Sequence, residues 1–278
     1  MKNIKYLLPL ALLFIYSSLA QSNMIQEIAS VTSILKSIEN NTLRPVPSVS
    51  WTGLDERQAY HVQKRLVSAL QEKGEHIVGF KAGLTRAGAA QKFELNSAIT
   101  GVLFASAEIK DLSSLSLTGS HRLMIEQELA FLLAADINHK IPDIASLKGH
   151  FSHLTYALEF PDLGFASRPN GFDIIANNAV NRFFYRGDWQ AIADNVDNLK
   201  VKLLCDNRQV NTGHSSDVME GQWQTLLWMV NALQAQGYAL KKGHILITGN
   251  LGDLIPAQMC RYNADFSELG QLQFSITP

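Results

Sequence analysis

The stretch MIEQELAF, residues 124–131, decides the fold and poses a problem of charge. As a β-strand it alternates between two faces, so Leu129 and Phe131 lie on one side while Glu126 and Glu128 lie on the other. The two carboxylates are then roughly 7 Å apart on a half-buried strand, where an unpaired ion costs several kcal/mol. We therefore expect a strand whose acidic face is neutralised by another group.

A third carboxylate interrupts the strand-like run HLTYALEFPD, residues 153–162, where Glu159 shares a face with Thr155 and Ala157. Three carboxylates on two neighbouring strands can converge on one hard divalent cation, since Mg²⁺ and Mn²⁺ prefer oxygen ligands. The alternative is that a Glu-x-Glu pair simply faces solvent. Spacing alone leaves both interpretations open.

Two further segments carry polar groups at strand positions. GFKAGLT, residues 79–85, places Lys81 among small residues, where it either extends to water or stabilises a developing oxyanion. HILITGN, residues 244–250, ends in Thr248, Gly249 and Asn250, whose hydroxyl, backbone and amide groups can bind a carboxylate. An ordinary strand end followed by a turn is the alternative for this second segment.

Beyond Gly74, short apolar runs punctuated by glycine predict strands. They are HIVGFKAGL, IEQELAFLLA, HLTYALEF, NRFFYRG, NLKVKLLC, HILITG and QLQFSI. Helical spacing recurs in 86–93, in 172–178 and most clearly in 217–236. Because no regular crossover helices separate the strands, a doubly wound parallel sheet fits poorly. The pattern predicts an α+β fold with a mixed, mostly antiparallel β core surrounded by helices.

The N-terminal segment has the layout of a secretory signal peptide, residues 1–20. Lys2 and Lys5 precede an apolar run over residues 6–16, which is followed by the small-residue site at residues 18–20, and we expect cleavage after Ala20. An uncleaved membrane anchor is the alternative, although the run is shorter than the roughly 20 residues that span a bilayer. Residues 21–54 then predict a helix, around 25–38, and a loop that pack on a main domain of residues 55–278. That domain opens with a helix around 55–73.

Composition narrows the functional classes. The 24 basic and 25 acidic residues balance, which removes the electrostatic basis for nucleic-acid binding or for an anionic membrane surface. Cys205 and Cys260 permit one disulfide in an oxidising compartment or two separate buried thiols. The chain lacks a Gly-x-Ser-x-Gly elbow, a Walker A loop, a Gly-x-Gly-x-x-Gly turn and a Cys-x-x-Cys pair, so the enzyme classes that use them lose support.

In their order and spacing, several segments between residues 55 and 276 resemble the 2-keto-4-pentenoate hydratase and 2-oxo-hepta-3-ene-dioate hydratase family, within the fumarylacetoacetate hydrolase superfamily. The segments are AYHVQ, VGFKAGLT, GVLF, IEQELAF, YALEF, DIIANNA, LLWMVNAL, GYALKKGHILITGN and LGQLQF. The resemblance implies a fold of the fumarylacetoacetate hydrolase C-terminal type. It also implies a homo-oligomer, which the export signal would place in the periplasm or outside the cell, free of the membrane after cleavage.

The same resemblance implies a site for Mg²⁺ or Mn²⁺ with Glu126, Glu128 and Glu159 as its ligands. Substrates of this family are 2-oxo acids, and the cation stabilises the enolate that forms during the reaction. Lys81 matches the family's active-site lysine. Thr248 and Asn250 fall where the family contacts the substrate carboxylate, with Asn250 replacing a more usual serine.

Three departures from the family pattern affect the functional inference. Ile99 stands where hydratases commonly carry an aspartate proposed as acid/base, and an isoleucine cannot transfer protons. The segment after the third ligand reads Asp162-Leu163-Gly164 instead of Asp-Ser-Arg, and an Asp-Asn pair is replaced by Asn177-Asn178. Groups for binding are therefore kept better than groups for proton transfer.

Three hypotheses follow for the function. The first is a metal-dependent lyase, of the hydratase or decarboxylase type, that acts on an unsaturated 2-oxo acid. The second is a C–C bond hydrolase of the same superfamily, which needs a base that the sequence does not identify. The third is a non-catalytic or repurposed metal-dependent protein that binds 2-oxo acids, favoured by the lost aspartate. The first explains Glu126, Glu128, Glu159 and Lys81 together.

Overall fold

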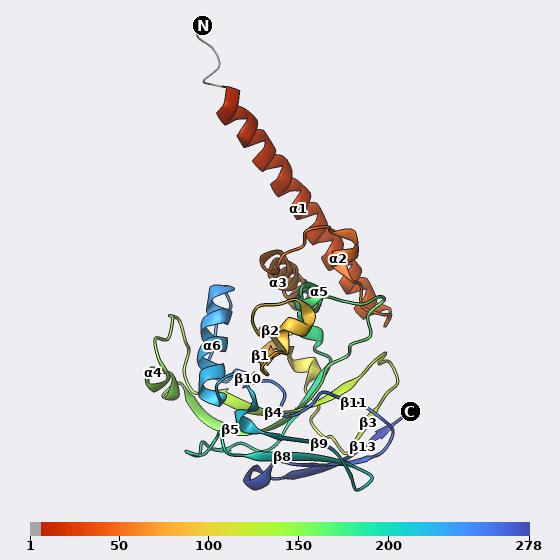
Figure 1. Cartoon of the computed structure of the whole chain (residues 1–278), viewed down its shortest axis with the longest axis vertical. Helices are drawn as coiled ribbons and strands as arrows, with labels where there is room; N and C mark the ends of the chain where they lie inside the picture. Colours follow the sequence, from red (N-terminus) through yellow and green to blue (C-terminus); the bar gives the residue numbers. More distant parts are fainter. Residues whose placement is uncertain (1–6) are drawn as a thin grey trace.

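The computed structural model describes the backbone of residues 7–278 and the side chains of residues 21–278. Lys2 and Lys5 of the predicted signal peptide lie outside the described residues. The helix α1 (Leu7–Glu39) passes through the predicted cleavage site after Ala20 and extends away from the body of the molecule (Figure 1). In residues 21–278, no helix combines the length and apolar character needed to cross a membrane.

Two β-sheets form the body of the molecule. The larger, eight-stranded sheet has the order β2-β1-β10-β4-β5-β6, with β11 paired to β4 and β7 paired to β5. Its strands are β1 (Ile77–Gly83), β2 (Ile99–Phe104), β4 (Met124–Leu133), β5 (Phe151–Phe160), β6 (Phe183–Arg186), β7 (Gln190–Ala191), β10 (Ile245–Ile247) and β11 (Ile255–Pro256). Of its pairings only β1 with β10 is parallel, so the mixed, mostly antiparallel core predicted from the sequence is confirmed.

The smaller sheet has the order β3-β13-β12-β8-β9. Its strands are β3 (Ser114–Ser116), β8 (Lys200–Cys205), β9 (Arg208–His214), β12 (Arg261–Asp265) and β13 (Gln271–Thr277). The apolar face of β4, including Leu129 and Phe131, shares one buried cluster with Leu203 of β8 and Phe274 of β13. The sheets therefore pack face to face, as Figure 1 shows in its lower half. The alternation expected for MIEQELAF directs its apolar side into this layer.

Helices cover the other face of the larger sheet, where the acidic side of β4 lies. They are α2 (Pro47–Ser50), α3 (Glu56–Glu72), α5 (Gly171–Ala176) and the body end of α1, with α4 (Ile144–Lys148) and α6 (Gln222–Ala235) at the flank. Asp55 begins α3 with a capping box, since its carboxylate accepts from Gln58 N at 2.7 Å and its own N–H reaches Gln58 Oε1 at 2.9 Å. Ile34 of α1 is fully buried in the same cluster as Val62 of α3, so this part of α1 packs on the body.

Some predicted boundaries were wrong. In place of a helix over 86–93 there is only a short 3₁₀ turn, η1 (Ala90–Phe93), because Gly88 has φ +75° and interrupts the helical pattern. The helix expected over 217–236 begins at Gln222, since Gly221 with φ +103° stands at its N-cap. The strands β9 and β12 were missed because their sequences, RQVNTGH and RYNAD, are largely polar.

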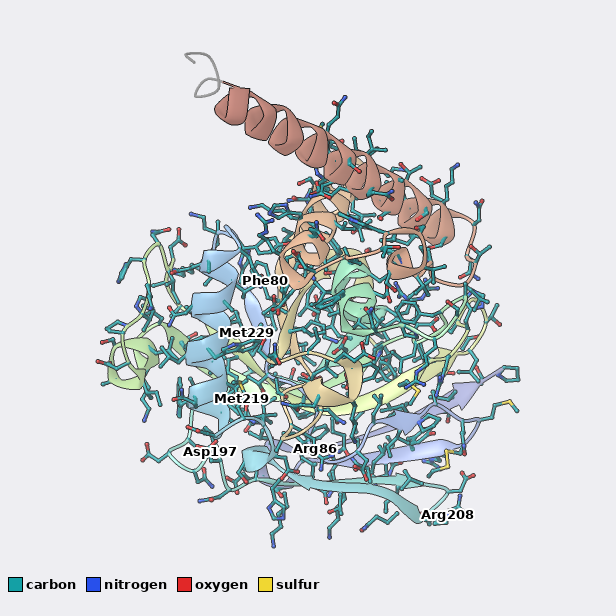
Figure 2. The ribbon with its side chains drawn as sticks, turned by 45° about the horizontal axis from the view of Figure 1, so that its top comes forward. Phe80, Arg86, Asp197, Arg208, Met219 and Met229 are labelled. Carbon is teal, nitrogen blue, oxygen red and sulfur yellow. A yellow bond between two sulfur atoms is a disulfide. The ribbon has the colours of Figure 1, made fainter. Side chains whose placement is uncertain are left out.

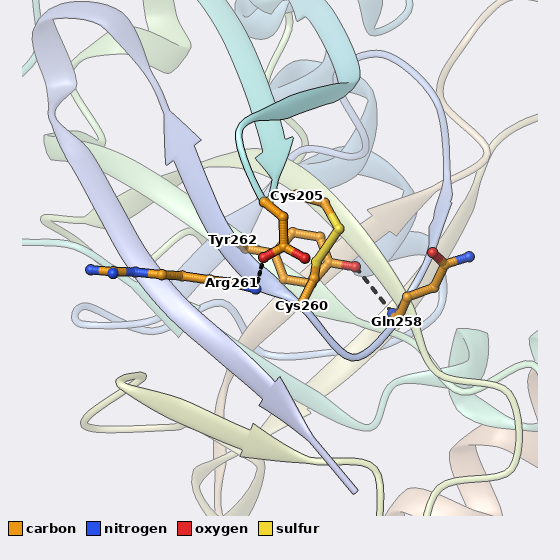
Figure 3. The surroundings of a disulfide bond; sticks show 6 residues. Cys205, Gln258, Cys260, Arg261 and Tyr262 are labelled. Atoms are coloured by element: carbon orange, nitrogen blue, oxygen red, sulfur yellow. Dashed lines mark hydrogen bonds between the residues drawn. A yellow bond between two sulfur atoms is a disulfide. The ribbon is translucent and has the colours of Figure 1, made fainter.

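The structure resolves the alternatives for the two cysteines. Cys205 at the end of β8 and Cys260 just before β12 form a disulfide (Figure 3). The two strands already pair side by side, with Tyr262 opposite Cys205. The bridge therefore fixes the edge of the smaller sheet that lies next to the β8–β9 turn.

Candidate metal centre

The register of β4 and β5 brings the three predicted glutamates together. Glu126 lies directly opposite Glu159, and Glu128 lies opposite Ala157 two residues further along the same face. Each of the three carboxylates offers an oxygen atom within 4.8 Å of the others. Glu128 and Glu159 are fully buried, while Glu126 keeps partial exposure at the edge of the group. We name these three residues the acid cluster.

Lys81 of β1 completes the acid cluster from the side. Its Nζ donates to Glu159 Oε1 at 2.5 Å and to the carbonyl of Ala179 at 3.3 Å. The lysine is 2% exposed, and burial alone would lower its pKa, but the three neighbouring carboxylates raise the pKa above its ordinary value. An ammonium ion is therefore held in place here, with one N–H still available for another acceptor.

One lysine does not neutralise three carboxylates. Burial raises the pKa of Glu126 to about 8, a rise to which Glu159 adds and which Lys81 opposes. Burial, Glu159 and Glu126 together raise the pKa of Glu128 well above its ordinary value, against the effect of Lys81 and of a backbone N–H at Gly249. In the absence of a cation the acid cluster consequently retains protons near neutral pH.

The hydrogen bonds of the acid cluster leave specific oxygen atoms without partners. Among the described residues, Glu128 Oε1 and Glu159 Oε2 are buried and accept no hydrogen bond. Buried carboxylate oxygens are rarely left in this state. Three converging carboxylates with two free oxygens match the oxygen-rich environment that Mg²⁺ and Mn²⁺ select. The residues present therefore fit a divalent cation.

A strained backbone segment supports the lysine. Asn178, Ala179 and Val180 have φ between 48° and 56°, the left-handed region, which is a marked outlier for a β-branched residue such as Val180. The Asn178 side chain holds this segment by bonding Val102 N at 2.7 Å and Val102 O at 2.9 Å. Gly101 permits the close approach, because a Cβ there would lie 2.9 Å from Ala179 Cβ. The strain positions the Ala179 carbonyl against Lys81.

The end of β10 meets the acid cluster through its backbone. The N–H of Gly249 donates to Glu128 Oε2 at 2.7 Å. Gly249 has φ +103°, and a Cβ at this position would lie 2.1 Å from the hydroxyl oxygen of Thr85. Glycine is therefore required both by the backbone conformation and by the contact with Thr85.

The two predicted carboxylate contacts, Thr248 and Asn250, flank Gly249 but differ in setting. Thr248 is fully buried, with its hydroxyl 2.6 Å from Gln222 Oε1 and 3.2 Å from the carbonyl of Leu129. Asn250 lines a cavity of about 370 Å³ that also reaches Glu126 and Thr85. The acid cluster is thus accessible from this cavity, whereas the Thr248 hydroxyl is already bonded within the protein.

The positions that depart from the family pattern have structural roles. Ile99 is 1% exposed in the apolar cluster beneath α3. The Asp162 carboxylate accepts three backbone N–H groups, from His121, Arg122 and Gly164, at 2.8–3.0 Å. Burial raises the pKa of Asp162, but these three bonds bring that pKa below its ordinary value. Asp162 therefore fixes a loop and has no free oxygen directed at the acid cluster.

Sequence reasoning assigned no role to two side chains of this centre. Asn181 Nδ2 donates to Glu159 Oε1 at 3.4 Å, and the Thr85 hydroxyl lies against Gly249, whose N–H bonds Glu128. Thr85 closes the segment GFKAGLT, so its place next to a functional lysine was the one available signal.

Known proteins resemble this chain in sequence and in fold. No protein-family model matches the chain. The chain is 23% identical over 256 residues to a 2-keto-4-pentenoate hydratase of Burkholderia vietnamiensis, covering 90% of this chain and 97% of that relative. Its fold matches, with a TM-score of 0.85 and 18% identity, a 4-oxalocrotonate decarboxylase from Pseudomonas putida G7 complexed with magnesium and adipate, covering 91% of this chain and 98% of that one.

A weaker likeness extends to a fumarylpyruvate hydrolase from Pseudomonas aeruginosa in complex with Mn²⁺ and pyruvate. The TM-score is 0.55 at 13% identity, covering 71% of this chain and 88% of the other. The resemblance read from the sequence and the fumarylacetoacetate hydrolase type of fold are both confirmed by these matches.

Proposed function

From this likeness to the 2-keto-4-pentenoate hydratases in sequence and to 4-oxalocrotonate decarboxylase in fold, we propose that the chain is a divalent-metal-dependent lyase. Its reaction is of the hydratase or decarboxylase type, and its substrate is an unsaturated 2-oxo acid. The observation that carries the proposal is the acid cluster, whose three carboxylates leave two buried oxygens free beside one fixed ammonium group. The relatives supply the substrate class by analogy.

Glu126, Glu128 and Glu159 would hold the cation, Mg²⁺ or Mn²⁺. When bound, such an ion acts as a Lewis acid that stabilises negative charge on the oxygens of a 2-oxo acid. Magnesium in the decarboxylase structure and Mn²⁺ in the hydrolase structure support a hard divalent ion. The partial exposure of Glu126 toward the cavity leaves the acid cluster open to a small ligand.

Lys81 contributes a fixed positive charge. Two of its three N–H groups bond Glu159 and the Ala179 carbonyl, so the third can donate to an oxygen that gains negative charge. Its pKa is raised, so the side chain stays protonated at neutral pH and does not serve as a base. The left-handed segment 178–180 sets the direction of that donor.

The second hypothesis, a C–C bond hydrolase, requires a base that deprotonates water. Among the described residues that line the cavity beside Glu126, none is histidine. Its titratable side chains there are Arg86, Lys92, Glu126 and Asp253, and Asp253 already pairs with Arg86 at 2.9 Å. The lyase is therefore the better supported of the two reactions.

A non-catalytic protein that binds 2-oxo acids is the second candidate, and Ile99 is the observation that favours it. The side chain is buried in an apolar cluster, so this position offers no acid or base to a substrate. The acid cluster and Lys81 would then hold a 2-oxo acid without converting it.

One assay separates these functions. The purified protein is incubated with Mg²⁺ or Mn²⁺ and 2-hydroxypenta-2,4-dienoate, and the loss of the dienol absorbance is followed. Turnover that falls at least about a hundredfold in Glu126→Gln supports the lyase, because that variant removes one ligand charge while keeping the side-chain shape. Tight binding of Mn²⁺ and oxalate without turnover, with activity gained by Ile99→Asp, supports the binding protein. If neither Mn²⁺ nor oxalate binds, both candidates are wrong.

We also propose that the protein is exported to the periplasm or secreted, and that it assembles as a homo-oligomer. The charged and apolar pattern of residues 1–20 and the disulfide between Cys205 and Cys260 support export, since disulfides persist in oxidising compartments. N-terminal sequencing of the protein recovered from producing cells tests the first point, with a mature end at Gln21 expected and an intact Met1 against it. Light scattering of the purified protein tests the second, and a monomer would contradict it.

A further inference from the structure

Thr85, which follows β1, has a buried hydroxyl that nothing in the described chain satisfies. The residue is 5% exposed, and its Oγ1 has no hydrogen-bond partner among the described residues. Buried hydroxyls in folded proteins almost always have a partner, in the protein or in a bound molecule. The Thr85 backbone is fixed, since its carbonyl accepts from Met219 N at 2.8 Å. An orphan hydroxyl on a fixed backbone indicates a group held ready for a ligand.

The hydroxyl lies near the acid cluster, beside the cavity that reaches Glu126. Its oxygen packs against Gly249, the residue whose N–H bonds Glu128. Thr85 also lines the same cavity as Glu126 and Asn250. Asn250 Oδ1 is buried and without a partner as well, so two polar groups in this wall are free. Figure 2 labels two neighbours of Thr85: Arg86, which follows it in the chain, and Met219, whose backbone N–H donates to the Thr85 carbonyl.

Thr248 provides the contrast. It was the threonine predicted from the sequence to contact a substrate carboxylate, but its hydroxyl lies 2.6 Å from Gln222 Oε1 and it is absent from the lining of this cavity. A hydroxyl has one proton to donate, and that proton is used between β10 and α6. Thr248 therefore holds the end of β10 in place, and with it the Gly249 N–H.

We propose that the Thr85 hydroxyl donates a hydrogen bond to the C1 carboxylate of the bound 2-oxo acid, and that Thr248 is a positioning residue that holds Gly249 against Glu128. The inference rests on the proposed function, because it needs a 2-oxo acid at the acid cluster. A neutral hydroxyl with a free proton favours an anionic acceptor, since hydrogen bonds to charged groups are the stronger ones. Thr85 thus selects acids over the corresponding neutral carbonyl compounds.

Isothermal titration with Mn²⁺, and then with oxalate in the presence of Mn²⁺, tests the inference on the purified protein. Thr85→Val keeps the shape of the side chain and removes the hydroxyl. We expect oxalate binding to weaken by about tenfold or more, the usual effect of losing one bond to a charged group, while Mn²⁺ affinity stays unchanged. Thr85→Ser should restore oxalate binding.

Thermal unfolding in the absence of metal gives a readout that a purely structural role would move differently. We expect Thr85→Val to unfold at the same or a higher temperature than the wild type, because it removes an unsatisfied buried hydroxyl. Thr248→Val is the matched control and should lower the unfolding temperature, because it leaves the Gln222 oxygen without its donor.

The outcomes separate the inference from the function beneath it. If the wild type binds neither Mn²⁺ nor oxalate, the proposed function is wrong and the role of Thr85 with it. If the wild type binds both and Thr85→Val binds oxalate equally well, only the role of Thr85 is wrong. Loss of Mn²⁺ binding or a lower unfolding temperature in Thr85→Val would likewise reject it, since either would mark the residue as structural.

Discussion

Among the side chains that the structure describes, two groups of residues have the composition of a metal site, and one of them has the electrostatics of a metal site. The acid cluster gathers Glu126, Glu128 and Glu159, while the edge of the smaller sheet gathers Cys205, Asp206 and Cys260. In the second group the sulfurs are bonded to each other (Figure 3), and the Asp206 carboxylate accepts from Arg261 N at 3.0 Å. Every ligand atom named in this second group already has a partner.

Local structure explains why Asp206 stands there. Asp206 and Asn207 connect β8 to β9, and both have positive φ, 47° and 67°, as a two-residue hairpin turn requires. Asp and Asn tolerate this conformation better than most residues. The acid cluster has no such local explanation, because strands do not favour glutamate. The candidate metal site is therefore marked by buried carboxylates that lack compensating partners, more than by the mere proximity of possible ligand atoms.

The largest expected effect is a loss of Mn²⁺ affinity when a charge of the acid cluster is removed. Glu128→Gln keeps an oxygen that can accept from Gly249 N–H but removes the charge. We expect Mn²⁺ affinity to fall at least about a hundredfold, roughly 3 kcal/mol, while metal-free stability stays the same or rises because glutamine cannot ionise beside the two other buried carboxyl groups. Titration calorimetry and urea unfolding measure the two quantities.

Glu108→Gln is the matched control for that variant. Its carboxylate is also largely buried, with an 8% exposed side chain, but it pairs with Lys110 and with Arg186 at 3.3 Å. We expect it to leave Mn²⁺ binding unchanged. Equal losses of Mn²⁺ affinity in the two variants would show that buried glutamates in general, and not this cluster, control the binding.

Removing the disulfide of the smaller sheet should lower stability and leave Mn²⁺ binding unchanged, the opposite of the result expected for Glu128→Gln. Replacing Cys205 and Cys260 together by alanine removes a bridge between residues 55 apart in sequence, which should lower the free energy of unfolding by about 2–4 kcal/mol. Mn²⁺ affinity should not change, because no cysteine or Asp206 atom serves the acid cluster. Urea unfolding and calorimetry on the same sample measure both. Weakened Mn²⁺ binding in the cysteine-free variant would contradict this, because it would show that the disulfide region influences the acid cluster.

The sequence allowed the strands that carry the site to be predicted, for a physical reason. Alternation along MIEQELAF sets which side chains share a face, and this depends only on strand geometry. Spacing within one strand says nothing about register with the next, so the placement of Glu126 opposite Glu159 was expected only as convergence of neighbouring strands. The family resemblance supplied the choice of those three glutamates and of Lys81.

Other features had no local signal. The left-handed run 178–180 is held by tertiary contacts, among them those of Asn178 with Val102 and of Lys81 with the Ala179 carbonyl. The same limit applies to the two threonines. From their segments Thr85 and Thr248 look alike, and only the tertiary position of Gln222 shows that one hydroxyl is bonded and the other is free. Hydrogen-bond satisfaction belongs to the packed structure and not to the pattern.

The smallest expected effect sharpens the comparison by pH. Burial raises the pKa of Glu126 to about 8, and the pKa of Glu128 is raised as well, so the folded metal-free protein binds protons that the unfolded chain releases near pH 4.5. Stability from these groups is complete below their unfolded pKa and is lost as pH rises toward 8. His244, whose pKa is lowered from 6.5, makes stability rise with pH, but only at lower pH.

Between about pH 6.5 and 8 we therefore expect urea stability in EDTA to fall by about 2 kcal/mol. Saturating Mn²⁺ should abolish or reverse that fall, because the cation binds the deprotonated carboxylates. If urea stability in EDTA did not change with pH, the carboxyl groups of the acid cluster would have ordinary pKa values. The cluster would then be no less well compensated than the group around Asp206 and the disulfide.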